Sequence, residues 1–421
     1  MFTFLHAADV HLDSPLIGLS RYEGAPVKEI RSATRQAFEN LVSLALERRV
    51  SFVILAGDLY DGDWKDFTTG LFFVHQMARL REASVPVFLV SGNHDADSQL
   101  THSLPLPDNV RRFSSSEAET YRLDELDVAV HGRSYPRRQV DEDLTESYPD
   151  PMPGMLNIGV LHTSLDGRPE HACYSPCSLD GLRARGYDYW ALGHVHAEEV
   201  VSEEPWVVFP GNIQGRHARE LGPKGCVLVS VDDGEVLGVE KQTLDVMRWA
   251  CCQIDASTAT TAEHVIEEAA KAFDRLADET DDRLLAVRLE IRGNSAAHRE
   301  LVARREQLLQ DIRAVSLDRG GGRLWLEKVI VATQTPPLTT GASAQATEEL
   351  GQMIRPLEKL VADEALVTDL ADAFKALWTK LPAKVQGLVA QSNDDAWPAT
   401  AAQVLAEARE IVLTALSEER R

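Results

Sequence analysis

The first half of the chain consists of short apolar runs, each of which stops at a polar motif. Residues 52–56 and 87–90 are wholly apolar, and runs this short without a polar member are typical of buried strands. Residues 28–49 and 67–83 space their apolar side chains three and four apart, which indicates amphipathic helices. The alternation predicts a layered α/β fold. Further strands are expected at residues 2–8, 128–130, 156–161, 189–192, 207–209 and 227–231.

The polar motifs combine histidine, aspartate and asparagine. They read Asp9-Val10-His11, Gly57-Asp58, Gly92-Asn93-His94-Asp95, His162 and Gly193-His194-Val195-His196. Each one alone is usually a turn or a surface pair. Because ligands bind at the carboxyl ends of strands in open α/β sheets, we expect the loops that carry these motifs to converge. The ordered set predicts a site for two divalent metal ions.

The ligand types define the chemistry of that site. Two cations about 3.5–4 Å apart need a shared ligand and private ligands on either side. Asp58 is our candidate for the shared ligand, because a carboxylate has two oxygens with lone pairs. The other candidate ligands are Asp9, His11, Asn93, His162, His194 and His196. Oxygen and nitrogen ligands without thiolate favour Mn²⁺, Fe or Zn²⁺ over Ca²⁺, and two such ions activate a water as hydroxide for in-line attack on a phosphate ester.

His94 is the candidate catalytic histidine. It directly follows Asn93, so its side chain is expected to point away from the asparagine and to face the substrate, where it can protonate the leaving oxygen. Asp95 is expected to fix the tautomer of His94. The loop 211–217, which contains His217, follows another strand and is expected to border the site.

Composition limits the possible partners. The chain has 43 Lys and Arg against 66 Asp and Glu, a net charge of -23, which weighs against a stand-alone nucleic-acid binder. Metal-binding carboxylates and local arginine clusters weaken that objection. The five cysteines form no zinc motif and are expected to be reduced thiols. We expect a cytoplasmic protein, because the chain has neither a membrane span nor the features of a secretory signal.

The chain is long enough for two or three domains. Residues 1–245 are expected to form the domain that carries the motifs, and residues 248–335 alternate strands and helices as a smaller α/β domain. Residues 333–343 have the composition of a linker. Beyond them, residues 346–421 are expected to be helical, and their apolar face either packs on this chain or docks on a partner.

Four segments carry the motifs in a recognisable form. They are Ala7-Ala8-Asp9-Val10-His11-Leu12-Asp13, Leu55-Ala56-Gly57-Asp58-Leu59-Tyr60-Asp61, Gly92-Asn93-His94-Asp95 and Tyr189-Trp190-Ala191-Leu192-Gly193-His194-Val195-His196. In this form they resemble the calcineurin-like metallophosphoesterase superfamily, and within it the SbcD-type DNA repair exonucleases. Residues 209–217 and 222–225 are similar to the YhaO branch of that group. The resemblance covers about residues 1–240 and is loose beyond Arg248.

The resemblance implies a layered β-sandwich flanked by helices, a capping domain at 248–335 and a helical ATPase-docking segment at 346–421. One metal ion would be held by Asp9, His11, Asp58 and His196. The other would be held by Asp58, Asn93, His162 and His194, with His94 as the catalytic histidine. Family members are typically Mn²⁺-dependent nucleases that dimerise and work with an SMC-like coiled-coil ATPase. One departure is that Tyr60-Asp61 stands where some relatives carry a histidine.

Three hypotheses remain open at this point. The leading one is a Mn²⁺-dependent DNA exonuclease or endonuclease of DNA repair. The second is a phosphodiesterase or phosphatase for a small substrate, which the acidic composition favours. The third is a mainly structural partner of an SMC-like ATPase, against which the complete ligand set and His94 argue, because a purely structural metal site needs no acid histidine.

Overall fold

The computed structural model describes most of the chain in two compact units. The described residues are 1–14, 25–61, 67–96, 105–165, 174–280, 283–336 and 363–380, with a few positions between 397 and 408. The first unit comprises Met1–Ala250 and Arg283–Ala286, and the second comprises Cys251–Asp282 and Val287–Arg421. Among the described helices, none is long and apolar enough to cross a membrane.

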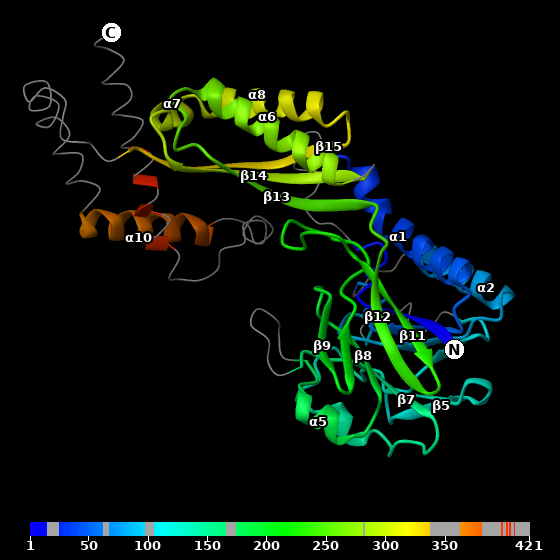
Figure 1. Cartoon of the computed structure of the whole chain (residues 1–421). Helices are drawn as coiled ribbons and strands as arrows, with labels where there is room; N and C mark the ends of the chain where they lie inside the picture. The colour runs from blue at the N-terminus through cyan, green and yellow to red at the C-terminus, as the bar shows by residue number, and fades with distance from the viewer. Residues whose placement is uncertain are drawn as a thin grey trace, which may run out of the picture. The chain divides into compact units, whose positions relative to one another are not determined.

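The first unit contains two six-stranded sheets (Figure 1). The first sheet has the order β12 (Glu235–Thr243), β11 (Gly225–Asp232), β1 (Phe2–Ala7), β2 (Phe52–Ala56), β3 (Val87–Val90) and β4 (Val110–Arg112). The second has the order β5 (Glu119–Leu123), β6 (Val128–Gly132), β7 (Leu156–His162), β8 (Tyr189–Gly193), β10 (Trp206–Phe209) and β9 (Glu199–Glu203). Strands β1 to β4 are parallel, as are β6, β7, β8 and β10.

The two sheets pack face to face over an apolar layer. Successive side chains of a strand point to opposite faces, so Phe4 and Phe52 face this layer and their rings stack with centroids 4.7 Å apart. Phe4 also meets the edge of Tyr189 from β8. The same layer holds the buried side chain of His6, which bonds Tyr189 Oη at 3.0 Å and the carbonyl of Leu192 at 3.1 Å. These polar contacts connect β1 with the second sheet.

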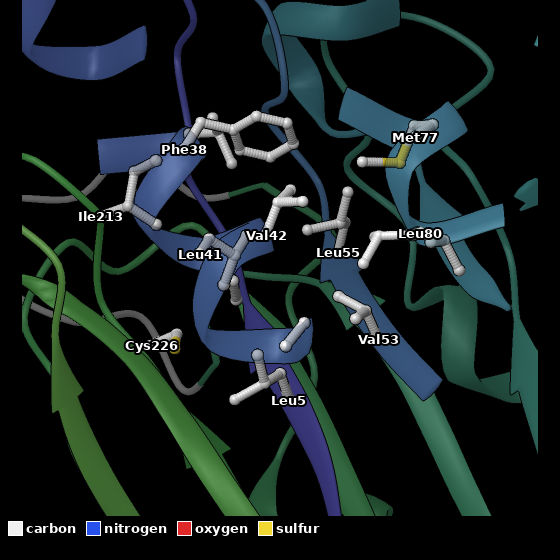
Figure 2. Close-up of a cluster of buried hydrophobic side chains, with 14 of the residues drawn as sticks. Leu5, Phe38, Leu41, Val42, Val53, Leu55, Met77, Leu80, Ile213 and Cys226 are labelled. Atoms are coloured by element: carbon white, nitrogen blue, oxygen red, sulfur yellow. The ribbon is translucent and has the colours of Figure 1, made fainter. Parts of the chain in front are cut away.

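Helices cover the outer faces of the sandwich. The opposite set of β1 and β2 side chains, including Leu5, Val53 and Leu55, packs under α1 (Val27–Arg48) and α2 (Phe67–Glu82), as Figure 2 shows. Because α1 spaces its apolar residues at helical intervals, one stripe that includes Phe38 and Leu41 is buried while the other face is solvated. A short helix, α5 (Leu179–Ala184), contributes Leu182 to a further cluster beside the second sheet. The predicted layered fold of sheets flanked by helices is confirmed.

The second unit is built around a three-stranded sheet. Its strands are β13 (Met247–Asp255), β14 (Leu284–Asn294) and β15 (Leu324–Gln334), of which the first residues of β13 and β14 belong to the first unit. Figure 1 shows α6 (Ala262–Glu279) and α8 (Arg305–Arg319) on one face of this sheet. A shorter helix, α7 (His298–Ala303), precedes α8, and the two are separate because Arg304 leaves the helical region between them.

One helix of the predicted C-terminal segment is described, α10 (Glu364–Lys380). Apart from the few positions between 397 and 408, the remainder of the segment expected at 346–421 lies outside the described residues, as does most of the expected linker at 333–343.

Candidate metal centre

The sequence motifs meet at one edge of the sandwich because each follows a parallel strand. Asp9 and His11 follow β1, Asp58 follows β2 and Asn93 follows β3 in the first sheet. His162 ends β7, while His194 and His196 follow β8 in the second sheet. The two sheets are joined at this edge by a bond of 2.9 Å between His162 Nδ1 and the carbonyl of Ala56. The parallel strands thus bring together residues that are far apart in the chain.

Among the residues that the structure describes, three groups of side chains are spaced closely enough to hold a metal ion, with ligand atoms within 4.8 Å of one another. They are Asp9 with His11 and His196, Asp9 with Asp58 and His162, and His11 with Asp58 and His94. Asp58 occurs in two of these groups, as do Asp9 and His11. The Oδ2 of Asp58 lies 3.3 Å from His162 Nε2 and 3.9 Å from His11 Nε2. A carboxylate between two sets of histidines has the position that a shared ligand requires.

Two other predicted ligands lie beside these groups. Asn93 places its carbonyl oxygen 3.0 Å from His162 Nε2. His194 belongs to none of the three groups found among the described residues. Its backbone N–H donates to both oxygens of Asp9, at 3.0 and 3.2 Å, and its ring meets that of His162 at 5.3 Å. The backbone of His194 therefore fixes the carboxylate of Asp9.

The backbone at this edge is unusual. Asp9, His11, Asp58 and His194 all have positive φ angles, of 50°, 46°, 52° and 100°. Residues other than glycine rarely adopt positive φ angles, which cost roughly 1–3 kcal/mol each. Such conformations concentrate at functional sites, where the surrounding contacts hold them.

Two glycines allow the loops to approach closely. A Cβ atom on Gly92 would lie 2.3 Å from Asp58 Oδ1, and one on Gly193 would lie 1.9 Å from the carbonyl of Ala56. Neither position has room for a larger residue without moving a candidate ligand or the β2 backbone. These two glycines, each directly before a motif residue, thus serve close packing.

Burial and mutual charge set the protonation of the central groups. Burial raises the pKa of Asp9 despite the opposing effect of His196. Burial acts in the same direction on Asp58, but His162 and His11 outweigh it and hold the pKa of Asp58 well below its ordinary value. Burial alone would lower the pKa of His162, whereas the charge of Asp58 raises it to about 9. The pKa of Asp9 is thus raised, whereas the pKa of Asp58 is lowered.

His11 provides the test of whether these residues fit a metal ion. It is fully buried, and neither ring nitrogen has a hydrogen-bond partner among the described residues. Burial, together with the charge of Arg216, lowers the pKa of His11 well below its ordinary value. A buried neutral imidazole with free nitrogens beside two carboxylates is a ligand set that suits divalent transition metals. The residues at this edge therefore fit a divalent metal ion.

His94 lies at the more open side of this cluster, with 30% of its side chain exposed. Its Nδ1 lies 2.7 Å from Asp61 Oδ1, and its backbone N–H donates to Asp58. Burial lowers the pKa of His94, but the hydrogen bond to Asp61 outweighs it and raises the pKa above its ordinary value. The orientation of the His94 ring is thus set by Asp61.

The structure corrects the role expected for Asp95. Its buried carboxylate accepts hydrogen bonds from the backbone N–H groups of Leu59, Tyr60 and Gly92 rather than from the His94 ring. Burial and the charge of Asp58 raise the pKa of Asp95 to about 6. Asp95 therefore fixes the loop after β2 against the loop after β3, and Asp61 has the orienting role that we expected of Asp95.

Three residues of the site were not predicted as functional. Asp61 belongs to a quoted motif, but its residue type alone gave no reason to select it. Glu220 accepts from His196 Nδ1 at 2.7 Å and from Asn212 Nδ2 at 3.0 Å, and no sequence pattern pointed to it. Arg216 lies in the loop expected to border the site, with Nη1 3.7 Å from Asp61 and Nη2 3.5 Å from Glu220. His217, which raised interest in that loop, is exposed.

The chain belongs to the calcineurin-like metallophosphoesterase family, as the resemblance predicted. Members of this family bind two divalent metals and are phosphoester hydrolases. The model of the calcineurin-like phosphoesterase family matches residues 2–198, and that of the middle domain of metallophosphoesterase YhaO matches residues 249–334.

The chain is similar to a YhaO protein and to several Mre11 proteins. The chain is 33% identical over 297 residues to the uncharacterized metallophosphoesterase YhaO of Bacillus subtilis, which covers 70% of this chain and 72% of that protein. It is 24% identical over 259 residues to the DNA double-strand break repair protein Mre11 of Sulfurisphaera tokodaii, covering 58% and 63%. The corresponding protein of Methanopyrus kandleri is 27% identical over 268 residues, covering 56% and 55%. The matches to both Mre11 proteins thus span less than two thirds of their lengths.

Proposed function

We propose that this protein is a metal-dependent phosphodiesterase that cleaves DNA as an exonuclease or endonuclease of DNA repair. One observation carries the proposal: the buried edge joins two carboxylates to several histidines, and His11 there has no hydrogen-bond partner among the described residues. The DNA substrate is supported by the similarity to proteins named for DNA double-strand break repair. Mn²⁺ is the metal we expect, with Fe and Zn²⁺ as the alternatives that the ligands allow.

The side chains divide into ligands and a proton carrier. Asp9, His11, Asp58 and His196 would hold one ion, and Asp58, Asn93, His162 and His194 the other. When bound, two such ions lower the pKa of a water molecule and neutralise charge on a phosphate ester. His94 then donates a proton to the leaving oxygen, because its Nδ1 is engaged with Asp61 and its Nε2 is left to face the substrate.

The proposal extends to domains and partners. Residues 1–245 would be the catalytic domain and residues 248–335 a capping domain, as we infer from the match to the YhaO middle domain. Helix α10 places Leu366, Leu370 and Leu377 at helical spacing, and Leu377 is 61% exposed. Such a face is suited to docking on a partner, for which we propose an SMC-like coiled-coil ATPase; a homodimer is the further assembly that the resemblance implies.

A second function has one observation in its favour. The net charge of -23 suits a small phosphodiester better than a polyanion. A phosphodiesterase for such a substrate would use the same ligands and the same His94. It would hydrolyse nucleotide esters well and gain nothing from a longer DNA strand.

The experiment compares substrates on one metal-loaded protein. Purified protein with Mn²⁺ is given end-labelled duplex DNA, single-stranded DNA and bis-p-nitrophenyl phosphate, with His94→Ala beside it and metal content measured for both. We expect DNA cleavage that disappears in His94→Ala while the metal content is unchanged. Hydrolysis of the small ester alone would favour the small-substrate function. Loss of metal together with activity would make His94 a ligand, a role that its place in one ligand group allows.

A further inference from the structure

Arg216 is held at the edge of the metal centre by two carboxylates. Its side chain is 14% exposed and lies between Asp61 on one side and Glu220 on the other. Asp61 is the residue that orients His94, and Glu220 is bonded to His196. The guanidinium therefore lies between the proposed proton carrier and a proposed metal ligand, and its charge acts on His11 and His94.

The contacts of Arg216 differ from those of arginines with a structural role in this protein. Arg288 binds Glu327 through two bonds of 2.9 Å, and Arg248 binds Asp245 through two bonds of 3.0 Å. Arg216 approaches its carboxylates only to 3.5 and 3.7 Å, and its buried Nε has no partner among the described residues. Charge-assisted bonds are normally about 2.7–2.9 Å long. The guanidinium is held in position, but its donors make no short hydrogen bond to either carboxylate.

The two carboxylates do not need the guanidinium of Arg216 to complete their hydrogen bonds. Glu220 accepts from His196, from the side chain of Asn212 and from the backbone N–H of Arg216, at 2.7, 3.0 and 2.7 Å. Asp61 binds His94 and accepts from the hydroxyl of Ser14. Both acids are thus satisfied at shorter range by other groups, whereas the guanidinium makes only long contacts, including one of 3.5 Å from Nη2 to His196 Nδ1, and its Nε has no partner among the described residues.

We propose that Arg216 binds a non-bridging oxygen of the substrate phosphate. A guanidinium presents five donors in a planar fork that matches two phosphate oxygens. Held on both sides by carboxylates, it loses little conformational freedom when the anion arrives. This role rests on the proposed function, because it takes the phosphate ester to lie between the metal ligands and His94. Arg216 would then favour molecules that carry a phosphoryl group over other molecules that can bind the metal ions.

The test measures phosphate binding without requiring turnover. Binding of inorganic phosphate to the Mn²⁺-loaded protein is followed by broadening of the ³¹P resonance, and inhibition by phosphate is followed with bis-p-nitrophenyl phosphate. We expect Arg216→Gln to weaken phosphate binding by roughly 10- to 150-fold, with Mn²⁺ affinity unchanged. Arg216→Lys keeps the charge without the fork and is expected to fall between wild type and Arg216→Gln. Arg219→Gln removes the same charge from an exposed position of the same loop and should behave as wild type.

A variant of the neighbouring acid separates this role from bracing of the metal centre. Glu220→Ala removes the partner of His196 and is expected to weaken Mn²⁺ binding by about 10- to 100-fold. If Arg216→Gln and Arg216→Lys lose Mn²⁺ in the same way, Arg216 is a positioning residue and the inference is overturned. Phosphate affinity equal to wild type in Arg216→Gln also overturns it. If wild type hydrolyses no phosphodiester but Arg216→Gln still loses phosphate, the proposed function fails and the anion site stands.

Discussion

His6 and His11 lie on either side of the end of β1, and both are fully buried. His6, in the layer between the sheets, bonds Tyr189 and Leu192 through its two ring nitrogens. His11, at the loop edge, has neither nitrogen bonded within the described residues. Buried polar groups without partners are costly. The comparison teaches that the inner layer completes its own hydrogen bonds, whereas the edge has ligand atoms left for an incoming group.

The backbone shows the same division. The strands carry ordinary extended geometry, while Asp9, His11 and Asp58, just beyond the ends of β1 and β2, adopt positive φ angles. The regular layer stabilises the fold through apolar packing, at about 25 cal/mol per Å² of apolar surface buried. The edge uses part of that stability to hold strained loops in place. Substitutions in the two regions are therefore expected to affect different measurements.

The largest effect is expected at Asp58. Asp58→Asn keeps the size of the side chain and a residue type that tolerates positive φ, but it removes the charged carboxylate proposed to be shared. We expect fewer than two metals per chain and no detectable hydrolysis, measured by elemental analysis and by the Mn²⁺-dependent assay. Asp124→Asn, whose side chain is 70% exposed, is the control. Two bound metals with full activity in Asp58→Asn would remove Asp58 from its role.

An intermediate effect is expected at Asp61, with a defined dependence on pH. The hydrogen bond to Asp61 raises the pKa of His94, so Asp61→Asn lowers that pKa. Because a general acid acts in its protonated form, the alkaline limb of the pH–rate profile moves to lower pH. We expect the rate near neutral pH to fall by roughly 10- to 100-fold with the metal content unchanged. An alkaline limb that stays in place would mean that His94 is not the acid.

The smallest effect, on stability alone, is expected at His6. Burial lowers the pKa of His6 to about 3 from an unfolded value of 6.5. The unfolded chain therefore binds this proton first, and the free energy of unfolding falls as the pH drops below 6.5, by about 1.4 kcal/mol per pH unit for this one group. His6→Gln removes that contribution. When the pH is lowered from 6.5 to about 5, the free energy of unfolding of the variant should fall by about 2 kcal/mol less than that of wild type.

Urea unfolding at the two pH values, with a chelator present, measures the difference for His6 without a contribution from metal. Equal losses in the two proteins would show that His6 is protonated in the folded state and that the inner layer does not exclude the charge.

The sequence predicted the strands inside the sheets and missed the strands at their edges. All eight strands expected in the first unit are present. Four others were not expected: β4 and β12 end the first sheet, and β5 and β9 end the second. Edge strands are partly solvated, so polar residues interrupt their sequences; β9, for example, reads Glu199–Glu203 with a glutamate at each end. An apolar run is a signal of burial, and these strands are not buried.

The residues of the site likewise fall into those that the sequence could predict and those that it could not. Candidate ligands such as Asp9 and His196 could be selected because each motif follows an apolar run that fixes its position in the sheet. Asp61, Arg216 and Glu220 act through contacts between loops, and loop conformation has no periodic pattern in the sequence. The misassigned role of Asp95 has the same origin, because adjacency in sequence does not determine which acid faces the His94 ring.

The position of β11 has a consequence for synthesis on the ribosome. β1 is translated well before β11 (Gly225–Asp232), yet β11 pairs along one of its edges while β2 pairs along the other. Translation proceeds at about 5–20 residues per second, so β1 waits on the order of ten seconds or more for this neighbour. The residues of the proposed centre extend from Asp9 to Glu220 over the same interval. The nascent chain thus cannot assemble the centre until translation has passed Glu220.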